Sequence, residues 1–169
     1  METEEEIEEL RRLNKQINTL YYTGKDEEWY ALLKKALEKS KAIEAYRLFF
    51  YGQIARYKNT DYKQQEELIR KAIYIRPEDF FLIRNLGACL SNQGKEDEAI
   101  RYFDEALKIK PYDNLTLNDK GASLSRQGNF EEGIHYFDEA LKIQPDDYLA
   151  LNNKGASLTV NLFSIRQVP

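Results

Sequence analysis

The chain has few of the residues that build disulfides and metal sites. Its 169 residues include one cysteine, Cys89, and one histidine, His135. A single cysteine cannot form an internal disulfide, and a structural zinc site usually takes four cysteine or histidine ligands. The counts therefore exclude both kinds of cross-link, and we expect no metal. We interpret Cys89 as a small buried residue and His135 as a surface residue.

Prolines, glycines and long apolar runs are also scarce. With four prolines, eight glycines, 42% hydrophobic and 32% charged residues, the composition is that of a folded chain and not of a disordered one. No apolar run approaches the roughly 18 residues that a membrane helix requires, so we expect no membrane segment. The first residues are acidic, where a secretory signal would be basic and then apolar. We therefore predict a cytoplasmic protein.

Motifs that carry catalysis are missing as well. The sequence has no phosphate-binding glycine loop and no nucleophile motif. Its carboxylates recur with the helix period, as in Glu98, Asp104 and Glu105, which is typical of a solvated helix face and not of a catalytic pair. We expect a protein that is not an enzyme, with no catalytic residue and no cofactor.

What the sequence does contain is an internal repeat of 34 residues. Residues 77–110 and 111–144 are identical at 18 of 34 positions, and residues 111–124 and 145–158 at 10 of 14. Such a period dictates the architecture of a chain before any single helix is assigned. Two columns mark the period most clearly: the prolines Pro77, Pro111 and Pro145, and the glycines Gly87, Gly121 and Gly155.

Each unit has the pattern of two helices. In the first, apolar residues recur at spacings of three and four from Leu82 to Leu90, and Gly94 ends the helix. A second helix begins at about Glu96. Glycine inside a helix costs about 1 kcal/mol relative to alanine, so its recurrence at one register indicates that paired helices cross closely there.

The pattern resembles the tetratricopeptide repeat. The resemblance implies an all-α fold, an α-solenoid of antiparallel helix pairs that stack into a right-handed superhelix. The sequence departs from the family at Gly133, where alanine is usual, and at Lys120. The matching residues are Leu86, Gly87, Leu90, Ala99, Phe103, Ala106 and Pro111, then Gly121, Leu124, Phe137, Ala140 and Pro145, then Leu151, Gly155 and Leu158.

The repeat fades toward both ends of the chain. We interpret 1–42 as a degenerate helical hairpin broken at Gly24, and 46–79 as a divergent repeat. Complete repeats follow at 80–113 and 114–147. Residues 148–160 then form a lone first helix of a further repeat, or a capping helix, and 161–169 form a tail because Asn161-Leu162 replaces the earlier Gln-Gly.

The resemblance implies a function in protein binding. In the family, the concave face is lined mainly by first helices and binds peptide segments of partner proteins. We therefore predict a non-catalytic protein-interaction scaffold. The peptide-binding residues expected from the family columns are Arg47, Phe50, Tyr51, Arg84, Asn85, Asn92, Asn118, Asp119, Arg126, Asn152 and Asn153.

Two of these residues, Phe50 and Tyr51, belong to a segment with more aromatics than one helix stripe can hold. An exposed aromatic beside Arg47 has the composition of an interface anchor. The alternative is that the helix is rotated, so that Phe50 points inward.

A subset of the family grips the carboxyl terminus of chaperone tails with two lysines, two asparagines and an arginine. In three possible windows of this sequence, Asn18 and Asn85 are the matching residues, and Asp119 would repel an anion. We do not expect that mode of binding here.

Two other functions stay open. The unpaired helix at 148–160 carries Leu149, Leu151, Leu158 and Val160, which could support a weak homodimer. The segment 41–76 has a net charge of +4 and could touch RNA. Its basic residues are spread around two helices, so we regard nucleic acid as an unlikely partner.

Overall fold

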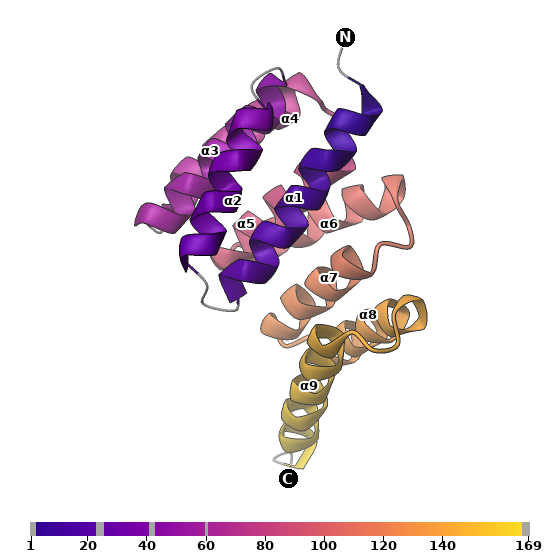
Figure 1. The fold of residues 1–169 in the computed structure, drawn as a ribbon. Coiled ribbons are helices and arrows are strands. Elements are labelled where there is room, and N and C mark those ends of the chain that lie inside the picture. The colour runs from indigo at the N-terminus through magenta and orange to yellow at the C-terminus, as the bar shows by residue number, and fades with distance from the viewer. Residues whose placement is uncertain (1–2, 23–25, 41–42, 60, 167–169) are drawn as a thin grey trace. The chain divides into compact units, whose positions relative to one another are not determined.

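A computed structural model describes residues 3–22, 26–40, 43–59 and 61–166. All regular structure in these residues is α-helical (Figure 1), which confirms the predicted all-α class. The residue Gly24, expected to break the first hairpin, lies outside the described residues. The helices are α1 (Glu4–Tyr22), α2 (Asp26–Lys39), α3 (Glu44–Asn59), α4 (Tyr62–Ile75), α5 (Phe80–Asn92), α6 (Glu96–Ile109), α7 (Asn114–Arg126), α8 (Phe130–Ile143) and α9 (Tyr148–Arg166).

The chain forms two compact units, residues 1–82 and residues 83–169. In the first, α1 packs on α2, α2 on α3, and α3 on α4. Its core is aromatic: Tyr46, Phe49 and Phe50 of α3 are all fully buried. The ring of Phe81 stacks on Tyr46 with centroids 5.7 Å apart and meets Phe49 edge to face at 5.0 Å.

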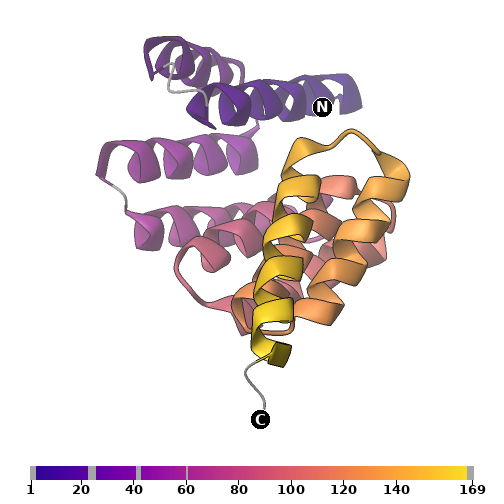
Figure 2. The same cartoon turned by 90° about the horizontal axis from the view of Figure 1, so that it is seen from below.

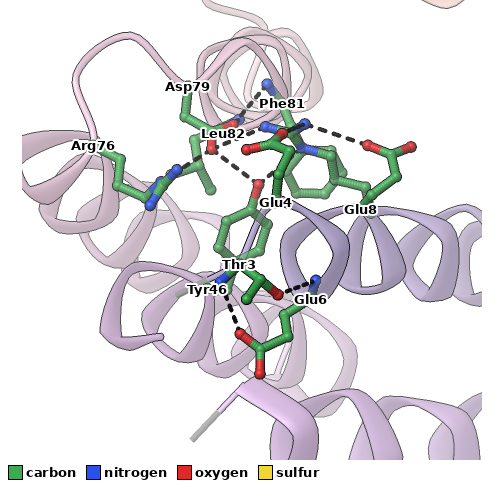
Figure 3. A network of polar contacts seen from close by, with 10 residues as sticks. Thr3, Glu4, Glu6, Glu8, Tyr46, Arg76, Asp79, Phe81 and Leu82 are labelled. Carbon is green, nitrogen blue, oxygen red and sulfur yellow. Dashed lines mark hydrogen bonds and ion pairs between the residues drawn. The ribbon is translucent and has the colours of Figure 1, made fainter. Parts of the chain in front are cut away.

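A buried carboxylate, Asp79, joins three parts of the first unit (Figure 3). Its Oδ1 accepts hydrogen bonds from the backbone N–H groups of Phe81 and Leu82, at 3.0 and 3.3 Å, and so caps the start of α5. Its Oδ2 accepts from the Tyr46 hydroxyl at 2.9 Å and from the Arg11 guanidinium at 3.2 Å. Burial raises the pKa of Tyr46, and the negative charge of Asp79 raises it further.

The same cap recurs every 34 residues. The carboxylate of Asp113 accepts from the backbone N–H of Thr116 at 3.0 Å, at the start of α7. The carboxylate of Asp147 accepts from the N–H groups of Leu149 and Ala150, at the start of α9. An aspartate two residues after each repeat proline therefore fixes where each first helix begins.

In the second unit, glycines set how closely the paired helices approach. A Cβ on Gly87 would lie 2.7 Å from Cε1 of Phe103, and one on Gly121 would lie 2.8 Å from both Cε1 of Phe137 and the backbone oxygen of Gly133. Real Cβ atoms do not approach other atoms this closely. The predicted steric requirement at the crossings of α5 with α6 and of α7 with α8 is confirmed.

Glycines also end the first helices of the complete repeats. The residues Gly94 and Gly128 have φ of 74° and 88°, and the next N–H bonds back to the carbonyl of Leu90 or Leu124 at 3.0 Å. Leu162 stands at the corresponding place in α9, and that helix continues to Arg166 (Figure 2). The expected tail at 161–169 is therefore wrong for 161–166, because the residue that could adopt the helix-ending conformation is absent.

Candidate functional site

Four of the predicted peptide-binding residues interlock across successive first helices of the second unit. The Nη2 of Arg84, on α5, donates to Oδ2 of Asp119, on α7, at 3.1 Å. The amide of Asn153, on α9, donates to Oδ1 of Asn118, on α7, at 3.0 Å. Both bonds join residues 35 apart, one more than the 34-residue period, so each bond links the first helices of two neighbouring repeats. We call Arg84, Asn118, Asp119 and Asn153 the first-helix ladder.

The first-helix ladder is largely withdrawn from water. The side chain of Arg84 is mostly buried, and its Nε has no hydrogen-bond partner in the described part of the chain. Burial raises the pKa of Asp119, against the opposing effect of the Arg84 guanidinium. Asn85 and Asn118 are buried too. The stacked helices hold these residues in place, and little of their surface is accessible.

Other members of the predicted set are open to solvent. Asn92 and Asn152 are exposed. The Nε of Arg126 donates to Oε1 of Glu96 at 2.6 Å, while its Nη2 reaches the hydroxyl groups of Ser91 and Ser123. Arg126 thus projects from the end of α7 over a small polar cluster, with half of its side chain accessible.

A hollow of about 220 Å³ lies beside Arg126, between α7, α8 and α9. The predicted residues Arg126 and Asn153 both line it. Their neighbours in the wall are Phe130 and Phe137 from α8 and Val160 from α9. The hollow combines an apolar lining with a cation and an amide at one place.

In the first unit, the outcome for the predicted residues differs. Phe50 is fully buried and packs edge to face on Phe49, with ring centroids 5.2 Å apart. The expectation that Phe50 is an exposed anchor is therefore wrong, and the alternative of an inward rotation is confirmed. Tyr51 is 46% exposed, and Arg47 faces Glu44 at 3.8 Å.

Several basic residues of 41–76 are paired with acidic neighbours. Arg70 contacts Glu66 at 2.9 Å, and Lys71 contacts Glu67 at 2.6 Å. The guanidinium of Arg76 contacts Asp79 at 3.3 Å. Glu66 and Glu67 are already included in the segment's net charge of +4, and Asp79 brings one further carboxylate to it.

Sequence reasoning missed one recurring contact between helices. Lys120 reaches back 16 residues to Oδ1 of Asp104 at 2.5 Å, and Lys154 reaches Oδ1 of Asp138 at the same distance. Burial opposes the charge of Lys120, yet its bonds to Asp104 and Tyr136 keep its pKa above the ordinary value. The equal spacing of lysine and aspartate in both repeats was the available signal.

The remaining side chains of interest behave as small or solvated groups. Cys89 is buried and His135 is exposed, as the sequence predicts. Within the described residues, no group of three or more histidine, cysteine, aspartate or glutamate side chains is placed to hold a metal ion. In the same part of the chain, no helix combines the length and apolar character needed to cross a membrane.

The helices and their contacts define an all-α helical-repeat solenoid. Two family models, both described as tetratricopeptide repeat, match residues 83–113 and 115–147. Residues 83–113 and 115–147 are therefore tetratricopeptide repeats, as the sequence predicted for this part of the chain.

Several solved structures similar to the chain are themselves tetratricopeptide-repeat domains. The first such domain of Spaghetti (RPAP3), bound to the HSP90 peptide SRMEEVD, has a TM-score of 0.65 at 17% identity and covers 70% of this chain and 94% of its own. The first domain of human RPAP3 has a TM-score of 0.68 at 16% identity, covering 73% and 97%. The Sgt2 domain from Aspergillus fumigatus has a TM-score of 0.69 at 14% identity, covering 75% and 85%.

A comparison with curated proteins gave no match. At these identities the solved structures establish the fold. Tetratricopeptide-repeat domains of this kind are protein-interaction modules.

Proposed function

We propose that the chain binds a peptide segment of a partner protein along the face formed by α5, α7 and α9 of the second unit. In the family this is the concave face. The observation that carries the proposal is the hollow beside α7, where Arg126 and Asn153 stand next to Phe130, Phe137 and Val160. Both polar residues were expected in the site from the sequence alone.

The chemistry of the hollow suits an extended segment that inserts one apolar side chain. Phe130 and Val160 would cover that side chain, while Arg126 would donate to a carbonyl or carboxylate beside it. Exposed amides at Asn92 and Asn152 would hydrogen-bond the peptide backbone, whose own groups lack partners in an extended conformation.

Recognition here should not depend on a terminal carboxylate. Asp119 stands within the first-helix ladder and is already paired with Arg84. A second anion brought to this position would meet the charge of Asp119, and the arginine would be shared between two acceptors. The Spaghetti (RPAP3) domain bound to SRMEEVD therefore supports a peptide ligand in general, and we propose a different ligand class for this chain, an internal segment with an apolar anchor.

The test begins with peptides selected from a random displayed library on the full chain, with affinities measured by titration calorimetry. The triple variant Asn92→Ala/Arg126→Ala/Asn152→Ala should weaken the selected peptides about tenfold or more. The matched control Arg101→Ala/Glu131→Ala/Lys142→Ala changes exposed residues of α6 and α8 and makes the same change in net charge. It should change affinity less than twofold.

Equal effects of the two triple variants would contradict the proposed face. The peptide SRMEEVD, with a free and with an amidated carboxyl terminus, provides the test of ligand class. We expect no preference for the free acid. Tight binding that is lost on amidation would show that this chain grips a carboxylate.

A further inference from the structure

One face of α9 carries an apolar stripe. Its large members are Tyr148, Leu151, Leu158 and Leu162, which are 63%, 49%, 41% and 58% exposed. They are spaced by three and four residues, with Gly155 in the middle, and this spacing places them in one line along the helix. We call Tyr148, Leu151, Gly155, Leu158 and Leu162 the α9 stripe.

The same columns are buried in the earlier repeats. Ile83 and Leu117 occupy the column of Leu151, Leu90 and Leu124 that of Leu158, and all four are at most 6% exposed. In those repeats the glycine column receives the ring of Phe103 or Phe137 from the paired helix, whereas nothing in the described residues lies within 4 Å of a Cβ built on Gly155. The α9 stripe is thus a helix-packing face on which no described helix packs.

We propose that a second copy of this chain covers the α9 stripe, through an antiparallel pairing of the two α9 helices about a twofold axis. The spacing of the stripe is self-complementary in that orientation. When Leu151 of one copy lies opposite Leu162 of the other, Gly155 lies opposite the second copy's Leu158. The leucine fills the space that a phenylalanine ring fills at Gly87 and Gly121.

Charge also favours a second copy as the occupant. Lys154 is the one charged residue between Tyr148 and Leu162, and its Nζ is held by Asp138 of α8 at 2.5 Å. A stripe with a charge of one sign would repel its own copy in a twofold pair, and this stripe carries no charge. An acidic or basic partner helix would find no counter-charge on it.

The pairing leaves the hollow of the proposed peptide site open, whereas Asn152 lies beside the α9 stripe. The residues of α9 that line the hollow are Asn153, Ala156, Ser157 and Val160, which lie on the side of the helix toward α7. The α9 stripe lies on another side of the helix. Dimer formation and peptide binding are therefore separable properties, with separate variants.

The expected dimer is weak. Each copy offers four large side chains, each about half exposed, so the pair removes on the order of 800 Å² from water. Stable complexes of standard size bury about 1,200–2,000 Å². We therefore expect monomers at a few micromolar and a growing fraction of dimers at some hundreds of micromolar.

Sedimentation equilibrium of the full chain from about 5 µM to about 500 µM tests the proposal. The variant Leu151→Asp/Leu162→Asp should remain monomeric throughout. The matched control Ile109→Asp/Ile143→Asp adds the same charge at two half-exposed isoleucines of α6 and α8 and should still dimerise. A monomer at every concentration, or a dimer that survives the α9 substitutions, overturns the proposal.

A cysteine cross-link tests the orientation. An equimolar mixture of Leu151→Cys and Leu162→Cys chains, treated with a mild oxidant, should form a disulfide between the two different chains. Two copies of the Leu151→Cys chain should not cross-link, because antiparallel pairing separates those positions by about 16 Å along the helices. Efficient self-linking of both single variants would show a parallel pair and overturn the antiparallel arrangement. The native Cys89 is buried, and wild-type protein provides the background.

Discussion

The same glycine-to-alanine substitution should raise stability at Gly155 and lower it at Gly87 and Gly121, although all three glycines occupy one column of the repeat. A Cβ at residue 121 would lie 2.8 Å from the backbone oxygen of Gly133, and a Cβ at residue 87 would lie 2.7 Å from the ring of Phe103. At Gly155, a Cβ would meet nothing in the described residues within 4 Å.

The magnitudes follow from two opposing effects. Alanine is favoured over glycine inside a helix by about 1 kcal/mol. At Gly155 that gain is unopposed, so Gly155→Ala should raise the free energy of unfolding by about 0.5–1 kcal/mol. At the other two positions, overpacking costs about 1–3 kcal/mol. The cost is larger at Gly121, because a backbone oxygen cannot rotate away as part of a ring can. The expected order of stability is Gly155→Ala, wild type, Gly87→Ala, Gly121→Ala.

Urea unfolding followed by circular dichroism at about 5 µM protein measures the four chains under conditions where the proposed dimer is dissociated. Thermal midpoints should differ by about 2–4 °C for each kcal/mol. The reasoning fails if Gly121→Ala is as stabilising as Gly155→Ala, since the close crossing of α7 and α8 would then be wrong. It also fails if Gly155→Ala is destabilising, since the α9 stripe would then be covered within the monomer.

Two further predictions concern the first unit. Tyr46→Phe should lower the free energy of unfolding by about 1.5–3 kcal/mol at pH 7 through loss of the hydrogen bond to Asp79. Because the folded pKa of Tyr46 is raised, the contribution is complete below the unfolded value of about 10 and is lost as the pH rises further. A gap between the two proteins that is undiminished at pH 11 would contradict this. Separately, Phe50→Ala should cost about 3–5 kcal/mol, whereas Tyr51→Ala should cost less than about 1 kcal/mol. Similar urea midpoints for these two variants would refute the orientation of α3.

The repeat period made the second unit predictable from sequence. Identical spacing of Gly87 and Gly121 indicated a helix crossing before any coordinates, and their contacts with Phe103 and Phe137 confirm it. The caps could have been found as well, since an aspartate that precedes an apolar helix satisfies its free N–H groups. Glycine crossings and aspartate caps can be predicted from sequence because all the residues that each one needs lie close together in the chain.

Phe50 could not be placed by the same reasoning. Pattern arguments assume that a helix buries one stripe, but α3 is covered by α2, by α4 and by Phe81. A helix that is packed on several sides buries aromatics around much of its circumference, so the sequence alone could not show which of them face solvent. The contact of Lys120 with Asp104 was missed for a different reason. The two residues belong to successive repeats, and the sequence pattern was analysed one repeat at a time.

Some of the predicted binding residues hold the repeats together, and others are exposed to a ligand. This difference affects how the face would select a ligand. The first-helix ladder binds neighbouring repeats to each other through residues 35 apart. Such residues recur because stacking requires them, whatever peptide is bound. The exposed residues Asn92 and Asn152 carry no such burden, whereas Arg126 has both roles, because it lines the hollow and also bonds Ser91 and Glu96 of the preceding repeat. Selectivity between peptides should therefore reside in Arg126 and the apolar hollow beside it, while changes to the ladder should lower stability and affinity together.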